Sequence, residues 1–220
     1  MKRKAFLFDL NGTMVNDMEY HLEAWFDIIN NDLKANIPRE DVKKEMYGKN
    51  AEVLVRVFGE GKFSIEKMNE ISEEKEKRYK KAYLPDLKLI AGLDEFLKAA
   101  KSKQIKMAIA SAAIQSNIDF VVDNLKITNF FAAMVSADDV EKSKPDPETF
   151  LKAAERIHAE PKDCIVFEDA PKGVEAASNA GMPAVVLTTM HEKEDFAQYS
   201  NILAFIKDYT DPFVKELLNQ

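Results

Sequence analysis

The chain has 220 residues, enough for one α/β domain with an insertion or for two small domains, and either arrangement buries a substantial core. It is 46% hydrophobic and 31% charged, as an ordinary globular protein is, and its net charge of −7 argues against a general binder of nucleic acids or of anionic membranes. The single Cys164 excludes an internal disulfide and fits a reducing compartment, so we expect a cytoplasmic protein. No apolar stretch approaches the length of a transmembrane helix or reads as a signal peptide.

The first predicted element is a short buried strand that ends at Asp9. The apolar run at 6–8 leads directly into a turn that contains Asn11 and Gly12. A carboxylate at the end of a buried strand is unfavourable unless a metal, a substrate or hydrogen bonds balance its charge. Asp9 is therefore a candidate site residue, although a capping or turn aspartate gives the same local pattern.

An all-helical segment follows this strand. Helical periodicity covers residues 17–34, 38–46, 51–58 and 64–82. Asp17 is predicted to be the N-cap of the first helix, and we interpret the charged run at 73–78 as a solvated helix face. Pro85 ends the last helix. We predict that residues 17–85 form an inserted cap, with hinges at 15–17 and 83–86.

From residue 87 onward, predicted strands and helices alternate. Strands are expected at 106–111, 132–136, 164–169, 183–188 and 202–206, and helices at 93–101, 114–124, 146–158, 171–179 and 211–218. This alternation predicts an α/β fold with a doubly wound parallel sheet, formed by residues 1–16 and 86–220. Asp9, Ser111 and Asp169 fall at carboxyl ends of strands, the edge at which such sheets bind ligands.

Four stretches in this order resemble the four motifs of the haloacid dehalogenase-like (HAD) phosphotransferase superfamily. They are Phe8-Asp9-Leu10-Asn11-Gly12-Thr13, Ala110-Ser111-Ala112-Ala113, Ser143-Lys144-Pro145-Asp146-Pro147, and Phe167-Glu168-Asp169 followed by Gly173 and Ala180-Gly181. The resemblance spans nearly the whole chain. Within the superfamily the chain is most similar to the β-phosphoglucomutase-like branch, which has a Rossmann-like core and a small helical cap.

The resemblance implies a phosphoryl-transfer enzyme in which Asp9 is the nucleophile and forms an aspartyl-phosphate. It further implies Mg²⁺ as the cofactor, held by Asp9, the backbone carbonyl of Asn11 and Asp169. Carboxylates and carbonyls are the oxygen ligands that this ion accepts. Glu168 is expected to be an outer or alternate ligand.

The resemblance also implies residues that bind the substrate. In the core, Lys144 would neutralise the phosphate and Asp9, while the Ser111 hydroxyl and neighbouring backbone N–H groups, including that of Ala112, would cover the remaining phosphate oxygens. As a lone residue, Lys144 also fits an ordinary surface loop.

In the cap, His21 and Trp25 match residues that border the active site in the β-phosphoglucomutase branch. Gly48 and Lys49 match its substrate-specificity loop, and Lys49 is the candidate for gripping a distal phosphate or a sugar hydroxyl. By themselves these patterns also fit a helix histidine and a solvated turn lysine. The branch has an arginine three residues beyond the loop glycine, where this chain has Ala51, and this difference weakens the case for a mutase.

The most important departure from the family is Asn11, which stands where the family has a second aspartate. That aspartate is the general acid and base, and such catalysis contributes roughly 10²–10⁴-fold to the rate. We expect a phosphatase of a small phosphorylated metabolite, such as a sugar phosphate, that acts as a monomer. The alternatives are a β-phosphoglucomutase-like mutase, a slow hydrolase that uses another base such as His21, an engineered Asp→Asn variant, or a phospholigand binder without turnover. Dehalogenation is disfavoured because the paired acids at 168 and 169 imply a metal.

Overall fold

The structure is a computed structural model that describes residues 5–219, and its internal contacts divide the chain into two units. The first unit takes in the chain up to Asn16 and again from Lys88 onward, and the second unit is Asp17–Leu87. Each unit has a hydrophobic core of its own. Among the described residues, no helix is long and apolar enough to cross a membrane.

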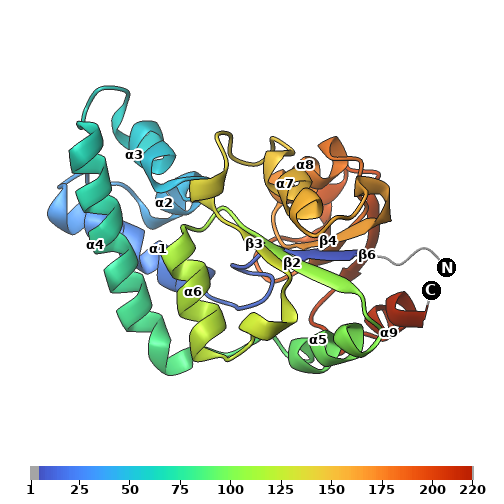
Figure 1. Ribbon diagram of the computed structural model, residues 1–220. Coiled ribbons are helices and arrows are strands. Elements are labelled where there is room, and N and C mark those ends of the chain that lie inside the picture. The colour runs from blue at the N-terminus through green and yellow to red at the C-terminus, as the bar shows by residue number, and fades with distance from the viewer. Residues whose placement is uncertain (1–4, 220) are drawn as a thin grey trace. The chain divides into compact units, whose positions relative to one another are not determined.

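A parallel β-sheet forms the centre of the first unit (Figure 1). Within the described residues the strand order is β3-β2-β1-β4-β5-β6, and every neighbouring pair is parallel. The strands are β1 (Ala5–Phe8), β2 (Lys106–Ala110), β3 (Ala133–Val135), β4 (Cys164–Glu168), β5 (Ala184–Leu187) and β6 (Ile202–Ile206). The order reverses at β1, between β2 and β4, and open sheets of this kind bind ligands at the reversal. The predicted doubly wound parallel sheet is confirmed.

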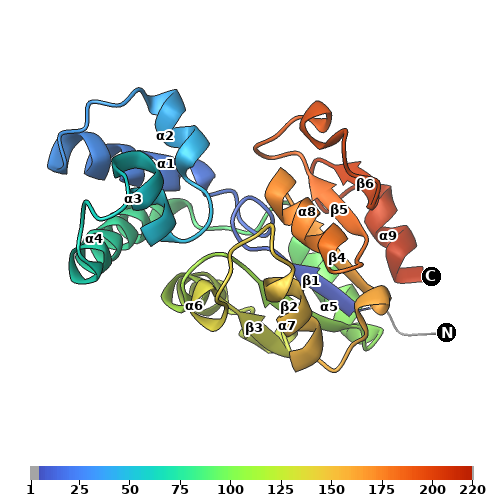
Figure 2. The same ribbon diagram turned by 90° about the horizontal axis from the view of Figure 1, so that it is seen from above.

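Helices cover both faces of this sheet (Figures 1 and 2). They are α5 (Leu93–Ser102), α6 (Gln115–Asn124), α7 (Glu148–Arg156), α8 (Pro171–Asn179) and α9 (Pro212–Asn219). On one face Leu7 of β1 joins the core that contains Phe150 of α7. On the other face Phe6 and Phe8 lie against Phe96 of α5, with ring centroids 5.3 and 6.3 Å apart. Because successive strand side chains point to opposite faces, β1 is buried on both, and this explains its uninterrupted apolar run.

The second unit is all helical. It contains α1 (Met18–Asp27), a π-helical turn (Ile28–Asp32), α2 (Arg39–Glu45), α3 (Asn50–Phe58) and α4 (Ile65–Tyr83), and a 3₁₀ turn with Pro85 follows. Its core consists of Leu22, Trp25, Ile28, Ile29, Val42, Val53, Leu54 and Ile71. The spacing of these apolar residues matches the helical period, which is why the sequence predicted each of the four helices. The π-helical turn was not predicted.

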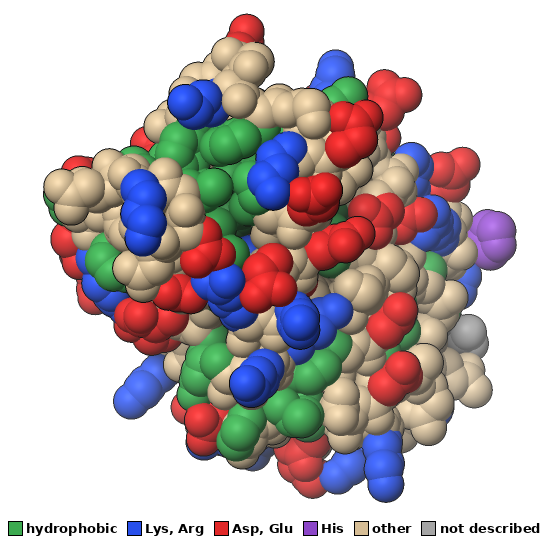
Figure 3. Space-filling view, turned by 90° about the vertical axis from the view of Figure 1, so that its left-hand side faces the viewer, with side chains coloured by type: hydrophobic (Ala, Val, Ile, Leu, Met, Phe, Trp, Pro, Cys, Tyr) green, Lys and Arg blue, Asp and Glu red, His purple; other side chains and the backbone are tan. Residues whose placement is uncertain are grey.

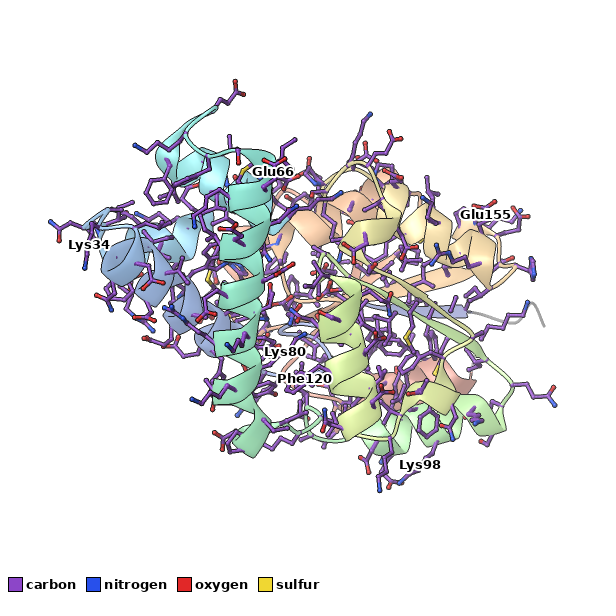
Figure 4. All side chains as sticks on the ribbon, turned by 60° about the vertical axis from the view of Figure 1, so that its left-hand side comes forward. Lys34, Glu66, Lys80, Lys98, Phe120 and Glu155 are labelled. Carbon is purple, nitrogen blue, oxygen red and sulfur yellow. The ribbon has the colours of Figure 1, made fainter. Side chains whose placement is uncertain are left out.

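The structure corrects the interpretation of the charged run at 73–78 as a solvated face. Lys75 is 2% exposed and Glu76 is 5% exposed, so both are buried within the helical unit. Figure 4 labels Glu66 and Lys80 near the two ends of the same helix, α4. Lys75 lies on the side of α4 that carries Ile71, and a charged residue within an apolar stripe was the signal for its burial.

Asp17 stands at the N-cap position of α1, as predicted. Asp17 precedes α1 but makes no side-chain capping hydrogen bond. Its carboxylate is fully buried and instead accepts a hydrogen bond of 2.5 Å from the hydroxyl of Tyr79 on α4. Asp17 therefore ties the start of α1 to α4.

Candidate functional site

Two buried acidic residues, Asp9 and Asp169, follow the carboxyl ends of the paired central strands β1 and β4. Strands β1 and β4 are paired in parallel with Phe8 opposite Phe167, so the residues that follow them reach the same edge. The backbone N–H of Asp9 extends this pairing by donating to Phe167 O at 3.0 Å. Asp9 is 7% exposed and Asp169 is 4% exposed. Burying a carboxylate is unfavourable unless a cation or hydrogen bonds compensate its charge.

Lys144 supplies positive charge at this edge. Its Nζ lies 2.7 Å from Asp9 Oδ1 and 2.7 Å from Glu168 Oε1, and it also donates to Ala110 O at 3.2 Å. Burial alone lowers the pKa of the Lys144 ammonium, but the charges of Asp9 and Glu168 outweigh burial and hold that pKa above its ordinary value. The three side chains therefore form a buried ion cluster with a permanently charged lysine at its centre.

Glu168 is fixed on all sides. Its Oε1 accepts from Lys144, and its Oε2 accepts from the backbone N–H groups of Asp169 and Ala170, both at 2.9 Å. The carboxylate lies directly against Gly173 of α8, where an added Cβ would be 1.8 Å from Oε1. Both carboxylate oxygens of Glu168 thus have protein partners, and only a glycine at 173 leaves room for them.

Asp169 is packed against the loop that follows Asp9. Gly12 in this loop has φ +72°, a left-handed conformation that glycine adopts without strain. A Cβ on Gly12 would lie 2.0 Å from Asp169 Oδ2. The Thr13 hydroxyl donates to Asp169 Oδ1 at 3.4 Å. Thr13 was not predicted as a site residue, although it directly follows the glycine of the first motif. Asn11 itself is half-buried beside Gly12.

Ser111 and Ala112 follow β2 and lie before α6. Ser111 is fully buried, and its Oγ accepts a hydrogen bond of 3.1 Å from the Ala113 N–H. That bond uses a lone pair of the hydroxyl and leaves its hydrogen to donate elsewhere. Ala112 is half-buried.

A second buried polar cluster lies inside the helical unit around His21. Lys75 Nζ is 2.6 Å from His21 Nδ1 and 3.0 Å from Glu76 Oε1. The His21 ring stacks on Tyr79 with centroids 3.7 Å apart, and Lys75 Nζ lies 5.5 Å from the centre of the Trp25 ring. Burial lowers the pKa of Lys75, and the Glu76 carboxylate opposes this effect. The structure therefore places the predicted pair His21 and Trp25 together and adds Lys75, Glu76 and Tyr79 to it.

The loop at Gly48 and Lys49 connects α2 to α3 in the helical unit. Gly48 has φ +75°, and the Lys49 N–H donates to Glu52 of α3 at 3.0 Å. Arg56 of α3 donates to the backbone carbonyl of Tyr47, and its guanidinium carbon lies 3.7 Å from the centre of the Tyr47 ring. This loop is thus held in shape by residues of α3.

The donor set at the sheet edge fits a hard divalent cation. Asp9 and Asp169 offer carboxylate oxygens, and Asn11, two residues after Asp9, offers a backbone carbonyl. Within residues 5–219, no three His, Cys, Asp or Glu side chains gather into a metal-binding group. Mg²⁺ is usually bound by one or two carboxylates, while water and substrate oxygens complete its shell.

The chain is similar to known proteins over most of its length. The family model described as haloacid dehalogenase-like hydrolase matches residues 6–187. The chain is 32% identical over 190 residues to a β-phosphoglucomutase of Bacillus subtilis, and this match covers 83% of the chain and 82% of that protein. It is 31% identical over 186 residues to a phosphorylated carbohydrates phosphatase of Thermotoga maritima, with 83% of each covered. A crystal structure of β-phosphoglucomutase from Clostridium difficile superposes with a TM-score of 0.84 at 25% identity, over 99% of this chain and 97% of that one.

The family match extends from the strand before Asp9 to the end of β5, and so takes in all four motifs. Relatives above 30% identity cover more than four-fifths of the chain. The resemblance inferred from the motifs is confirmed: the chain belongs to the haloacid dehalogenase-like hydrolase family.

Proposed function

We propose that this protein is a Mg²⁺-dependent phosphatase that hydrolyses a small phosphate monoester, most suitably a sugar phosphate, through an aspartyl-phosphate on Asp9. The observation that carries the proposal is the 2.7 Å contact between Lys144 and Asp9, beside Asp169 at the same sheet edge. The phosphatase name of the Thermotoga maritima relative supports the reaction class.

Asp9 is proposed as the nucleophile. Its carboxylate attacks phosphorus and forms an acyl phosphate on Asp9, while the bond to the ester oxygen breaks and the alcohol leaves with a proton taken from solvent. Two anions must approach each other in this step, and Lys144 reduces their repulsion. Because Glu168 holds Lys144 from its other side, the ammonium keeps its place when Asp9 changes charge.

Asp9, the Asn11 carbonyl and Asp169 are proposed to hold Mg²⁺. The ion, when bound, would neutralise the phosphate charge and align the group for attack. Glu168 was expected to be an outer or alternate ligand. Its hydrogen bonds to Lys144, Asp169 and Ala170 support an indirect role, in which it fixes the direction of its neighbours.

Ser111 and Ala112 are proposed to bind the phosphate oxygens. The Ser111 hydroxyl has its hydrogen available, and the loop that contains Ala112 precedes α6, whose N-terminal N–H groups favour anions. His21, Trp25, Gly48 and Lys49 of the helical unit are proposed to contact the rest of the substrate, with residues 17–85 acting as a cap on the catalytic core. The face in Figure 3 shows acidic and basic side chains interspersed. Lys144 is proposed as the local group that attracts the anion.

Asn11 sets the speed of turnover. An asparagine side chain neither protonates the leaving oxygen nor removes a proton from the attacking water. Phosphorylation of Asp9 is therefore proposed to proceed best with activated esters, while hydrolysis of the aspartyl-phosphate is slow.

Asn11 also gives a second candidate, a phospholigand binder without turnover. A mutase is less well supported, because it must hold two phosphate positions. The methyl side chain of Ala51 cannot bind the second phosphate. The monomeric state and the absence of nucleic-acid partners remain expectations from the sequence.

The proposal is tested by measuring phosphate release from a panel of sugar phosphates and from an aryl phosphate, with and without Mg²⁺. We expect slow, Mg²⁺-dependent release that Asp9→Asn abolishes. Unchanged turnover in Asp9→Asn would refute the nucleophile assignment. Saturable Mg²⁺-dependent binding with no release from the chain would favour the binder.

A further inference from the structure

The loop that follows Asp9 is held from outside by two hydroxyl groups. Thr189 Oγ1 donates to Gly12 O at 2.6 Å, and the Tyr209 hydroxyl donates to Thr13 O at 3.1 Å. Thr189 follows β5 and Tyr209 lies between β6 and α9. Both donors lie beyond residues 6–187, which the family model matches, whereas both acceptors lie within the first motif.

This loop determines where Asp169 stands relative to Asp9. The Cα of Gly12 faces the Asp169 carboxylate so closely that no Cβ fits between them. The Thr13 hydroxyl donates to the same carboxylate. A shift of the loop by a few tenths of an ångström would therefore move the Asn11 carbonyl. It would also change the contacts of Gly12 and Thr13 with the Asp169 carboxylate.

Tyr209 is a rigid support for this loop. It is 2% exposed, and its ring lies among Phe8, Phe96 and Phe167, with centroids 6.4, 5.7 and 5.6 Å away. Its backbone N–H donates to Ala91 O at 2.9 Å. A side chain packed this tightly holds its hydroxyl at a fixed point, so the bond to the loop carbonyl is pre-organised.

The Tyr209 hydroxyl also stays protonated. Burial, together with the charges of Asp9 and Asp169, raises its pKa well above the ordinary value. The Tyr209 hydroxyl therefore carries the hydrogen that it donates to Thr13 O. The half-buried Thr189 donates to the preceding carbonyl, that of Gly12.

We propose that Thr189 and Tyr209 are positioning residues for the metal site: by holding the carbonyls of Gly12 and Thr13, they set the distance between the Asn11 carbonyl and Asp169. The inference rests on the proposed function only in assigning Mg²⁺ to Asp9, Asn11 and Asp169. It adds a contribution from the segment after β5 that none of the four motifs contains.

The test uses Tyr209→Phe and Thr189→Val, which keep the shape of each side chain and remove its hydroxyl. Matched controls are Tyr199→Phe and Thr188→Val, which lose hydroxyls bonded to Glu175 and to Ile206 O, away from the loop. Mg²⁺ binding is measured by titration calorimetry without substrate, the melting temperature is measured without metal, and phosphate release is measured over a range of Mg²⁺ concentrations.

We expect each of Tyr209→Phe and Thr189→Val to weaken Mg²⁺ binding about fivefold, as the loss of one hydrogen bond would, and the double variant to weaken it further. The Mg²⁺ concentration for half-maximal activity should rise by the same factor, with kcat at saturating Mg²⁺ nearly unchanged. The controls should stay within twofold of the wild type. A lower melting temperature with unchanged Mg²⁺ affinity would show that the hydroxyls only stabilise the fold and would overturn the inference.

The two proposals fail in different ways. If the wild type binds Mg²⁺ but releases no phosphate, the phosphatase proposal fails, and calorimetry of the variants still decides the positioning role. If the wild type releases phosphate and the variants match it in Mg²⁺ affinity, only the positioning role fails. If the wild type shows no saturable Mg²⁺ binding, the positioning role is refuted together with the metal site.

Discussion

Lys144 Nζ lies 2.7 Å from Asp9 Oδ1, although 135 positions separate the two residues in the chain. The contact forms because the loop after β3 and the end of β1 meet at the same edge of the sheet. It gives the proposed nucleophile a permanent cationic partner.

Lys144→Met should reduce phosphate release by about 10²–10³-fold, since it removes a fixed charge from the site and leaves Asp9 and Glu168 facing each other. Steady-state assays at saturating Mg²⁺ measure the loss. Lys142→Met is the matched control, because Lys142 lies in the same loop with its side chain 73% exposed, and it should stay within twofold of the wild type. Retention of a tenth of the activity by Lys144→Met would contradict the role of this lysine.

Gly12→Ala should disrupt the site beyond its effect on stability. Gly12 and Gly181 both have φ +72°, so alanine at either position introduces backbone strain of about 1–2 kcal/mol. Only at Gly12 does the new Cβ collide with Asp169, whereas nothing lies within 4 Å of it at Gly181. Urea unfolding should show a stability loss for both variants, larger for Gly12→Ala because of this collision. Activity assays should show at least about a 100-fold loss for Gly12→Ala alone. Equal activity in the two variants would show that Asp169 has no fixed position in the reaction.

Asn11→Asp should raise turnover by about 10²–10⁴-fold, because the new carboxylate transfers protons to and from the ester and water. Burst kinetics with an aryl phosphate separate the two steps, and hydrolysis of the aspartyl-phosphate should gain most. A gain below threefold would mean that another group already carries the proton. His21→Ala would then be the next variant, although the partners of His21 in its own unit, Lys75 and Tyr79, favour a structural role.

Glu76→Gln should lower the free energy of unfolding by about 2–3 kcal/mol, since it leaves the Lys75 ammonium buried without its anion. In the variant Lys75 can lose its proton, because burial has already lowered the pKa of Lys75. This deprotonation limits the loss of stability. Glu74→Gln is the matched control on the same helix. Arg78, the partner of Glu74, is partly exposed. We therefore expect Glu74→Gln to lower the free energy of unfolding, measured in urea, by less than about 1 kcal/mol. Equal losses would show that the buried cluster contributes no more than a surface ion pair.

Asp139 should make stability depend on acid pH. The Arg156 guanidinium, with help from Ser136, lowers the pKa of Asp139 to about 2, below its value of about 3.9 in an unfolded chain. The stabilisation is therefore complete above about pH 4 and is lost as the pH falls to about 2. Asp139→Asn should lower the unfolding free energy by about 1 kcal/mol at pH 7, after allowance for the partial exposure of Asp139. Urea unfolding is measured at pH 7, 4 and 2.5. The difference in unfolding free energy between wild type and variant should shrink as the pH falls, and a constant difference would refute this assignment.

The sequence by itself determined the elements, the sheet and the family. Short continuous apolar runs and apolar residues with a period of 3.6 depend on local chain geometry, so strands such as β1 and helices such as α8 were predicted close to their observed bounds. The motif residues fall at strand ends, and parallel topology brings those ends to one edge of the sheet. The grouping of Asp9, Lys144 and Asp169 therefore followed from order along the chain.

Only the tertiary structure decided the partners of individual side chains. The burial of Lys75 and Glu76 depends on how α4 packs against α1, which a charged run does not reveal. The proposed roles of Thr189 and Tyr209 depend on two hydroxyls reaching a loop 177 and 196 residues earlier in the chain. Such contacts have no local pattern, because they are fixed by the packing of the whole sheet and its helices rather than by neighbours in the sequence.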